Sequence, residues 1–238
     1  TQNNFISSFS AIIFYLIPGI TFSSFITTTD VPLILFSSVF VFLFLIIYKK
    51  HNPSYFYFFL LGIIFTLGFL SKYAMAYFLF SILIATVSFK NVRTKILNLK
   101  GVFFLLIFFI SISPHLYWNF KNGFVTFNHT AHNANFGSIN LNIKEPLLFI
   151  LSQFIVFGIY PLFLISQKIL KYKKLDEEKK ILLIFFFTPI IIISLLSLFS
   201  RANANWAAVG FPCGIIFLAI IVNNKKEILK KYYLLLSQ

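Results

Sequence analysis

Long apolar windows without charged residues recur along most of the chain. A helix needs about 20 mostly apolar residues to cross the hydrocarbon core of a bilayer, and eight windows approach that length. Polar and apolar residues do not alternate within them, as they would in the strands of a membrane β-barrel. Because lipid excludes exposed loops and sheet edges, the pattern predicts about eight transmembrane helices, at residues 5–22, 31–48, 55–70, 73–89, 102–117, 146–166, 181–199 and 207–222.

Several windows are slightly shorter than a full span, so we expect some helix tilt or local bilayer thinning. A ninth charge-free window, residues 122–143, is rich in Asn, Thr and His, and we interpret it as a loop. No internal repeat or linker divides the chain. The predicted fold class is therefore all-α, with residues 1–238 forming one polytopic transmembrane helical bundle.

Basic residues alternate from loop to loop along the chain. One set of loops holds 16 Lys and Arg residues (49–52, 90–100, 167–180 and 223–231), and the other holds only 4 (23–30, 71–72, 118–145 and 200–206). In membrane proteins the excess of Lys and Arg lies in the cytoplasmic loops. The first set is therefore predicted to be cytoplasmic and the second set to face outward, with Thr1 on the cytoplasmic side.

Composition narrows the class of protein. Apolar residues make up 59% of the 238 residues and charged residues only 11%, against roughly 25% charged residues in soluble domains. This excludes a soluble globule, and the high hydrophobicity excludes a disordered chain. The net charge of +14 is explained by topology and anionic lipid, so we expect membrane lipid as a partner and no nucleic acid. The single cysteine, Cys213, excludes a disulfide framework.

The two ends of the sequence suggest a piece of a longer protein. The chain begins at Thr1, and its one methionine, Met75, lies inside an apolar window. A new apolar run begins at residues 232–238, where the sequence stops. We therefore expect a fragment that is truncated at both ends.

The residues that carry chemistry gather in the predicted outer loops. Three of the four histidines, both tryptophans and one of the two arginines lie there. The cytoplasmic loops, by contrast, hold mainly basic residues. We therefore expect a site at the outer face, with a candidate set of Asp30, Lys72, Tyr73, His115, Trp118, Asn119, His129, His132, Gln153, Arg201, Asn205 and Trp206.

Asp30 and Lys72 each have two interpretations. Asp30 stands two residues before Pro32 at a predicted helix start, where it is either a helix N-cap or a carboxylate held at the membrane surface. Lys72 lies between two spans that leave almost no loop. It is either a snorkelling lysine or a compact ammonium group that binds a lipid phosphate, and its place on the side that topology disfavours supports the second interpretation.

The long outer loop contains further candidates. Trp118 suits an aromatic belt at the membrane interface. His129 and His132 are three residues apart and would share a helix face, so they are weak candidates for a divalent metal site without an identified third ligand.

Gln153 and Arg201 also keep two interpretations. Gln153 lies about two turns into a predicted span, where a polar side chain faces a cavity or makes an interhelical hydrogen bond. Arg201 either clamps a phosphate through its planar guanidinium group or ends a helix with a charge.

The sequence contains no phosphate-binding Gly loop, no Gly-x-Ser-x-Gly elbow and no His-Glu-x-x-His motif. Four segments instead occur in order on the predicted outer side: Thr28-Thr29-Asp30-Val31-Pro32-Leu33, Gly68-Phe69-Leu70-Ser71-Lys72-Tyr73, Pro114-His115-Leu116-Tyr117-Trp118-Asn119 and Asn203-Ala204-Asn205-Trp206-Ala207-Ala208. Together they resemble the polytopic glycosyltransferases related to dolichyl-phosphate-mannose protein mannosyltransferases, whose bacterial branch includes the lipid A aminoarabinose transferases.

The resemblance implies a GT-C membrane fold and a sugar donor linked to polyprenyl phosphate. It also implies transfer to a lipid or protein acceptor on the extracytoplasmic side, in a bacterial inner membrane. By motif match, Asp30 is the second acidic residue of the family and Lys72 is the lysine of its Ser-Lys-Tyr turn. The principal catalytic carboxylate of the family lies in the first outer loop, which would precede Thr1.

These inferences give a mechanistic hypothesis. A carboxylate activates an acceptor hydroxyl, which attacks the anomeric carbon, while Lys72 and Arg201 stabilise the leaving phosphate. Asp30 orients sugar hydroxyls or the acceptor. The remaining candidates are expected to line the substrate, and the need for a divalent metal stays open. The alternative function is a multi-pass transporter or lipid-handling permease, because prolines inside several spans suit broken helices.

Overall fold

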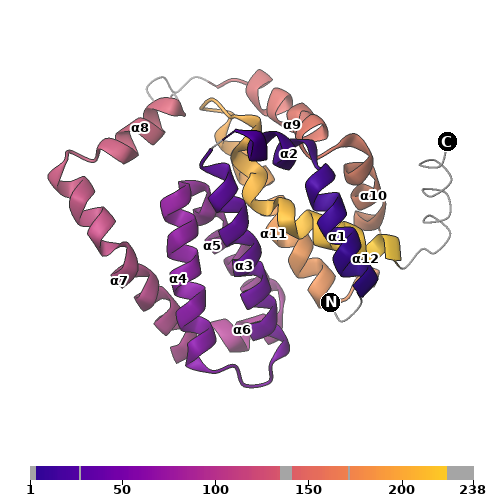
Figure 1. Ribbon diagram of the computed structural model, residues 1–238, viewed down its shortest axis with the longest axis horizontal. Coiled ribbons are helices and arrows are strands. Elements are labelled where there is room, and N and C mark those ends of the chain that lie inside the picture. Colours follow the sequence, from indigo (N-terminus) through magenta and orange to yellow (C-terminus); the bar gives the residue numbers. More distant parts are fainter. Residues whose placement is uncertain (1–3, 27, 135–140, 171, 224–238) are drawn as a thin grey trace.

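The computed structural model describes residues 4–26, 28–134, 141–170 and 172–223 (Figure 1). The predicted cytoplasmic loop at residues 223–231 and the apolar run at 232–238 lie outside the described residues, apart from Asn223. In the described part every regular element is a helix: α1 (Asn4–Leu16), α2 (Pro18–Phe25), α3 (Asp30–Lys49), α4 (Tyr55–Ser71), η1 (Tyr73–Ala76), α5 (Tyr77–Ser88), α6 (Lys90–Ile96), α7 (Leu99–Lys121), α8 (Val125–Asn133), α9 (Lys144–Val156), α10 (Ile159–Ile169), η2 (Tyr172–Lys174), α11 (Glu177–Leu196), η3 (Ala204–Gly210) and α12 (Phe211–Asn223). The predicted all-α class is confirmed.

The structure supports fewer membrane spans than the eight that the sequence predicts. Among the described residues, four helices are long and apolar enough to cross a membrane, and two bent helix pairs raise that number to six. The two remaining predicted windows form shorter apolar helices, Tyr55–Ser71 and Tyr73–Ser88. All eight predicted windows are thus largely helical, but the count of eight spans is not confirmed.

Two predicted spans are bent rather than continuous. The axes of α1 and α2 meet at 65°, and Pro18 opens α2, where its missing N–H costs no hydrogen bond. The axes of α9 and α10 meet at 107°. Gly158 stands at this second break with φ of 103°, a conformation that is open to glycine and strained for other residues. Each bent pair is either a broken span or a re-entrant segment.

The predicted loop at residues 122–143 is partly wrong, because Val125–Asn133 forms helix α8. A tight turn joins α7 to α8, and Gly123 and Phe124 both have positive φ in it. The carbonyl of Asn119 accepts hydrogen bonds from the backbone N–H groups of Asn122 and Phe124 at 3.2 and 2.7 Å. The turn therefore satisfies the carbonyl at the end of α7 and lets a polar helix begin at once.

Phenylalanine rings form the centre of the bundle. Phe40 of α3 is fully buried, and its ring centroid lies 5.6 Å from those of Phe65 (α4) and Phe78 (α5). The rings of Phe104 (α7) and Phe185 (α11) lie 6.4 and 6.5 Å away. Such tilted aromatic pairs stabilise a core beyond the area that they bury. Phe40 therefore joins five helices.

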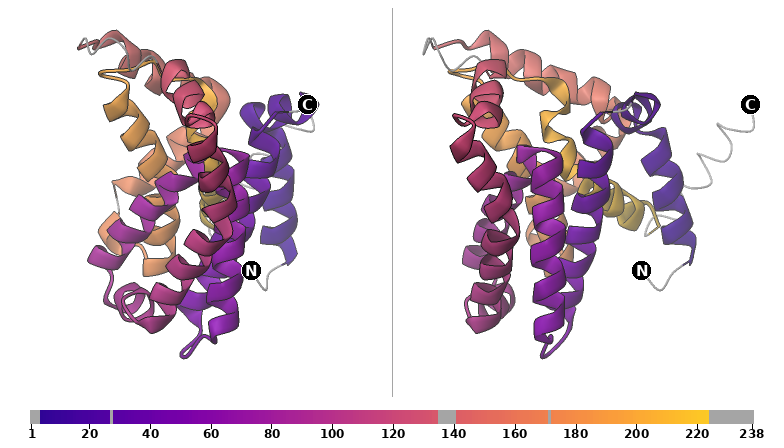
Figure 2. Two further views of the ribbon diagram at one scale, coloured as in Figure 1. Left: turned by 90° about the vertical axis from the view of Figure 1, so that its left-hand side faces the viewer. Right: turned by 60° about the vertical axis from the view of Figure 1, so that its left-hand side comes forward.

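Contacts place the predicted loops at two opposite ends. At one end Lys49 Nζ lies 2.9 Å from Glu178 Oε2, which joins loops 49–52 and 167–180. At the other end the backbone N–H of Arg201 donates a hydrogen bond to the backbone carbonyl of Ala134 at 2.9 Å. Figures 1 and 2 show α3, α4 and α7 running between these ends, with α6 near the first and α8 and α9 near the second. The described loops therefore separate into the two predicted sets, and which set faces the cytoplasm stays a prediction.

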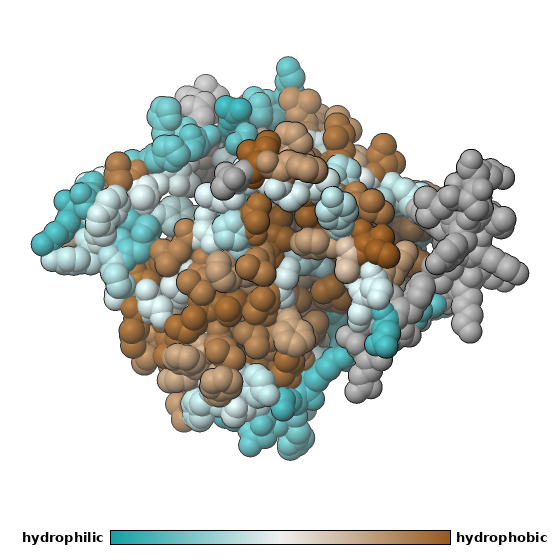
Figure 3. Space-filling model, in the orientation of Figure 1, coloured by the Kyte–Doolittle hydropathy of each residue, from teal (hydrophilic) through white to brown (hydrophobic). Residues whose placement is uncertain are grey.

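An apolar surface lies between the two polar ends. Figure 3 shows apolar residues across the middle of one face, with polar residues gathered at its lower end and upper left. Large apolar side chains of α7 are exposed, including Phe109 and Ile110 at 59% and 61%. An exposed apolar surface of this extent indicates contact with lipid.

Candidate functional site

A buried carboxylate joins three of the four sequence motifs. Asp30, the first residue of α3, is only 2% exposed. One of its oxygens accepts a hydrogen bond from Lys72 Nζ at 2.6 Å, and the other accepts one from Asn205 Nδ2 at 2.6 Å. Lys72 is the C-cap residue of α4, and Asn205 lies on η3. Segments 42 and 175 residues from Asp30 therefore meet at one side chain.

The interpretation of Asp30 as a pure helix cap is wrong. The N-cap residue of α3 is Thr29, and no side chain caps this helix through a hydrogen bond. The Lys72 ammonium group pairs with Asp30, and 21% of the Lys72 side chain is exposed. Removing one partner of such a desolvated pair typically costs about 3–5 kcal/mol. The pair is therefore a fixed part of the fold.

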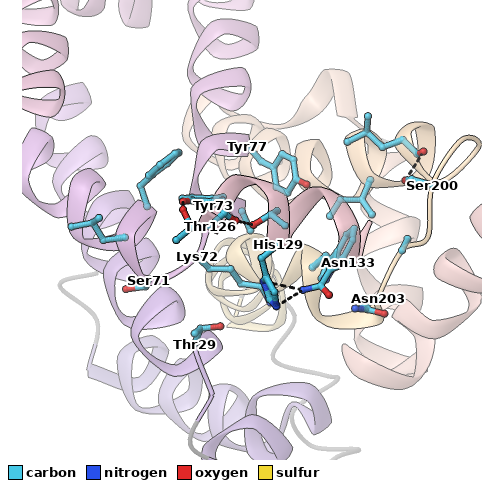
Figure 4. Close-up of a pocket in the computed structure, with 18 of the residues that line it drawn as sticks. Thr29, Ser71, Lys72, Tyr73, Tyr77, Thr126, His129, Asn133, Ser200 and Asn203 are labelled. Atoms are coloured by element: carbon cyan, nitrogen blue, oxygen red, sulfur yellow. Dashed lines mark hydrogen bonds between the residues drawn. The ribbon is translucent and has the colours of Figure 1, made fainter. Parts of the chain in front are cut away.

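A pocket of about 740 Å³ opens beside this ion pair. Figure 4 shows its residues, with Thr29 and Lys72 on one side and Ser200 and Asn203 on the other. Of the predicted candidates, five line it: Lys72, Tyr73, His115, His129 and Trp206. The pocket wall is contributed by Thr29, α4, η1, α5, α7, α8, α11, the segment that leads into η3 and η3 itself.

Tyr73 anchors a second polar cluster at the pocket. Its hydroxyl lies 2.9 Å from His115 Nε2 and 2.6 Å from Thr126 Oγ1. Asn119, which is fully buried, accepts from the Thr126 hydroxyl at 2.6 Å and donates to the His115 carbonyl at 3.0 Å. The Tyr73 ring also stacks on Phe127, with centroids 5.1 Å apart. This cluster fixes α8 against the end of α7 and explains why Asn119 lies behind the pocket wall.

The other seven candidates do not line the pocket: Asp30, Asn119 and Asn205, described above, and Trp118, His132, Gln153 and Arg201. Trp118 is 49% exposed, as an interfacial anchor would be. His132 and Arg201 are exposed and do not line the pocket. Gln153 is 3% exposed and donates to the Ala204 carbonyl at 3.0 Å, so the interpretation as an interhelical hydrogen bond is the one that the structure supports. Its Oε1 atom has no partner among the described residues.

The metal candidates find no third ligand in the described part of the chain. No group of three or more His, Cys, Asp or Glu residues is placed there to hold a metal ion. His129 instead lies 3.3 Å from the side-chain amide of Asn133, one helical turn away.

Sequence reasoning missed several lining residues. Thr29 directly precedes the candidate Asp30, and Tyr77 follows the candidate Tyr73 by four residues. Asn133, Ser200 and Asn203 lie in segments that the sequence predicts to be loops. The sequence signal for Tyr77 is only its position, five residues after Lys72 and near the start of a predicted span. Its aromatic character made it indistinguishable from the many apolar residues around it.

Comparison with known proteins agrees with the motifs. Residues 3–118, just under half of the chain, match the family described as dolichyl-phosphate-mannose-protein mannosyltransferase. A similar protein is the lipid A galacturonosyltransferase RgtD of Rhizobium johnstonii, with 23% identity over 204 residues. That alignment covers 84% of this chain and 42% of the relative, so the chain spans less than half of the relative's length. No solved structure gives a significant match.

The fold and these matches define the class of the protein as an all-α, multi-pass membrane protein. More particularly, the resemblance to the dolichyl-phosphate-mannose-protein mannosyltransferase family is confirmed. The matched segment includes Asp30, Lys72, Tyr73 and His115, which lie at or beside the pocket.

Proposed function

We propose that this chain carries part of the catalytic site of a membrane glycosyltransferase. The enzyme would take a sugar from a polyprenyl-phosphate-linked donor and transfer it to a lipid or protein acceptor on the extracytoplasmic side. The observation that carries the proposal is the pocket beside Lys72, whose ammonium group is held by Asp30 in a segment that matches the family. The similar protein from Rhizobium johnstonii is a lipid A galacturonosyltransferase, which supports the same reaction class.

Lys72 is the proposed phosphate-binding residue. An ammonium group has three N–H donors, and one of them is directed to Asp30 at 2.6 Å. The other two have no partner among the described residues, and they are available to the oxygens of a lipid phosphate that enters the pocket. A positive charge fixed where negative charge develops on the leaving group stabilises the transition state. Because Arg201 does not line the pocket, the proposal assigns the phosphate to Lys72.

Asp30 is better suited to position Lys72 than to act as a base. Both of its oxygens already accept hydrogen bonds, from Lys72 and Asn205, and it is almost fully buried. A general base must reach the proton that it removes. A carboxylate other than Asp30 therefore acts as the general base. Asp30 positions the ammonium group of Lys72.

The reaction is a single displacement at the anomeric carbon. The base takes the proton of an acceptor hydroxyl, and the acceptor oxygen forms a bond to the anomeric carbon. The bond between that carbon and the phosphate oxygen breaks, and its electron pair leaves with the lipid phosphate. Lys72 pairs with the charge that the phosphate gains.

Steady-state kinetics of Asp30→Asn in the full-length protein test these roles. The neutral amide still fills the site but holds Lys72 less firmly, so we expect the donor KM to rise more than tenfold and kcat to fall as well, because Lys72 both binds the donor phosphate and pairs with the charge that it gains. Loss of a general base would instead lower kcat with little change in KM. That second result would return Asp30 to the role of a catalytic carboxylate.

A transporter or lipid-handling permease is the second candidate, and the 107° bend between α9 and α10 favours it. The polar side chains of the pocket, however, lie at one end of the bundle with α8, whereas transporter sites lie near the bilayer midplane. A labelled lipid-linked sugar distinguishes the two, since an enzyme releases polyprenyl phosphate and a permease moves the donor unchanged.

A further inference from the structure

Besides Lys72, two aromatic side chains contribute to the pocket lining. Tyr77 is the first residue of α5, and Trp206 lies on η3. Both also pack against one small buried cluster that contains Phe149, Ile193 and Ala207. Each side chain is therefore held from behind by apolar packing while it contributes to the pocket surface.

The hydroxyl group of Tyr77 differs from that of its neighbour Tyr73. The Tyr73 hydroxyl is already bonded to His115 and Thr126. The Tyr77 hydroxyl has no hydrogen-bond partner among the residues that the structure describes, and Figure 4 shows this side chain directed toward the middle of the lining residues. A tyrosine hydroxyl in an apolar setting usually has a polar partner. This one is therefore available to a ligand.

The chemistry of this wall suits a sugar ring. Aromatic rings present large, rigid faces for apolar contact, and the tyrosine hydroxyl adds one polar contact. Ser200 and Asn203 line the same pocket and carry neutral hydrogen-bonding groups. Ligand sites in proteins commonly combine aromatic walls with a few placed polar groups of this kind.

We propose that Tyr77 and Trp206 hold the sugar of the lipid-linked donor, next to a phosphate held by Lys72. This inference rests on the proposed function and names two further binding residues for it. The four-residue helix η1, Tyr73–Ala76, connects Lys72 to Tyr77. The phosphate and sugar contacts are thus held at a fixed distance by one short element of the fold.

The test compares a lipid phosphate with and without its sugar. Binding of a short polyprenyl phosphate, and of the same lipid carrying mannose or galacturonic acid, is measured with the full-length protein in lipid nanodiscs. Tyr77→Phe removes only the hydroxyl, and we expect affinity for the sugar-bearing lipid to fall about five- to tenfold, the loss that one hydrogen bond explains. Affinity for the bare polyprenyl phosphate should stay within twofold of wild type.

Trp206→Leu keeps an apolar side chain against the buried cluster but removes the aromatic face. It should lower the affinity for the sugar-bearing lipid at least fivefold and leave the affinity for the bare polyprenyl phosphate within twofold of wild type. Tyr117→Phe is the matched control, because Tyr117 is 60% exposed and does not line the pocket. Thermal unfolding of each variant checks that the fold is retained.

The outcomes separate this inference from the proposed function. If Tyr77→Phe and Trp206→Leu bind both lipids as wild type does, while wild type transfers sugar, the wall does not hold the sugar and the proposed function stands. If both variants lose the bare and the sugar-bearing lipid equally, their role is structural and the inference is overturned. If wild type transfers no sugar from any lipid-linked donor, the proposed function itself fails.

Discussion

The pair formed by Asp30 and Lys72 combines a structural role with a proposed chemical one. Lys72→Met removes the charge but leaves the Asp30 carboxylate, whose side chain is 3% exposed, with Asn205 as its remaining partner. A buried carboxylate without its cation costs about 3–5 kcal/mol, so we expect this variant to unfold at a clearly lower temperature than wild type in detergent.

The double variant Asp30→Asn/Lys72→Met separates stability from binding. It contains no buried charge at this position, and replacing both partners of an ion pair is often close to neutral. We therefore expect most of the lost stability to return while binding of polyprenyl phosphate remains at least tenfold weaker than in wild type. Binding within twofold of wild type would remove Lys72 from the phosphate site.

At the residue scale, the sequence points to five residues that line one pocket, but it does not predict the contacts between them. Lys72 was singled out because a lysine on the outer side opposes the charge rule. Asp30 binds Lys72, 42 residues away in the sequence, and Asn205, 175 residues away. No local sequence pattern encodes contacts between such distant residues. Arg201 was a reasonable phosphate ligand from its charge, but the chain direction at this turn leaves it exposed outside the pocket.

At the element scale, glycine sets the distance between α4 and α7. A Cβ atom on Gly62 would lie 2.7 Å from Ile107 Cγ2 and 3.1 Å from the Phe104 carbonyl oxygen. Gly62→Ala must therefore push the helices apart, and overpacking of this kind costs about 1–3 kcal/mol. Thermal unfolding should show the loss, whereas Leu67→Ala, at a position on α4 that is 38% exposed, should show less.

The start of α11 gives a prediction that depends on pH. Partial burial raises the pKa of Asp176, but hydrogen bonds and charge from Lys179 outweigh it and hold the pKa below its ordinary value. The carboxylate also accepts from the Lys179 backbone N–H at 3.2 Å, as an N-cap. A lowered pKa stabilises the fold above the unfolded pKa of about 4 and loses that effect as the pH falls through the folded pKa.

Asp176→Ala should therefore destabilise the protein by about 0.5–1 kcal/mol at neutral pH, a modest value because the side chain is 58% exposed. The difference from wild type should shrink as the pH falls below 4. Thermal unfolding between pH 7 and pH 3 measures this. A difference that is unchanged at pH 3 would mean that the charge of Asp176 contributes nothing.

Helix content was predictable because every span carries a long apolar window. The breaks within spans were harder to predict. Pro18 and Gly158 are both visible in the sequence, but the bend at Gly158 depends on its positive φ, and a glycine inside an apolar window adopts either sign of φ. The sequence does not predict helix α8, because six of its nine residues are polar and none is buried.

At the scale of the whole molecule, topology is the prediction that most needs a test. Cys213 is fully buried, so it contributes little background when cysteines placed elsewhere in this chain are labelled. Ala131→Cys on α8 and Lys173→Cys on η2 lie at exposed positions in loops predicted to face opposite sides. In intact cells, a membrane-impermeant thiol reagent should label Ala131→Cys, and it should label Lys173→Cys only after lysis. The reverse pattern would invert the orientation.

The central claim is that this protein transfers a sugar from a polyprenyl phosphate and that Lys72 holds the phosphate. The most direct measurement follows a doubly labelled donor, with one label on the sugar and one on the lipid, in proteoliposomes that contain the full-length protein and a lipid A acceptor. Wild type should release polyprenyl phosphate as the sugar label moves to the acceptor, and Asp30→Asn/Lys72→Met should do neither. Movement of the intact donor across the bilayer without release, or equal turnover by the double variant, would contradict the account.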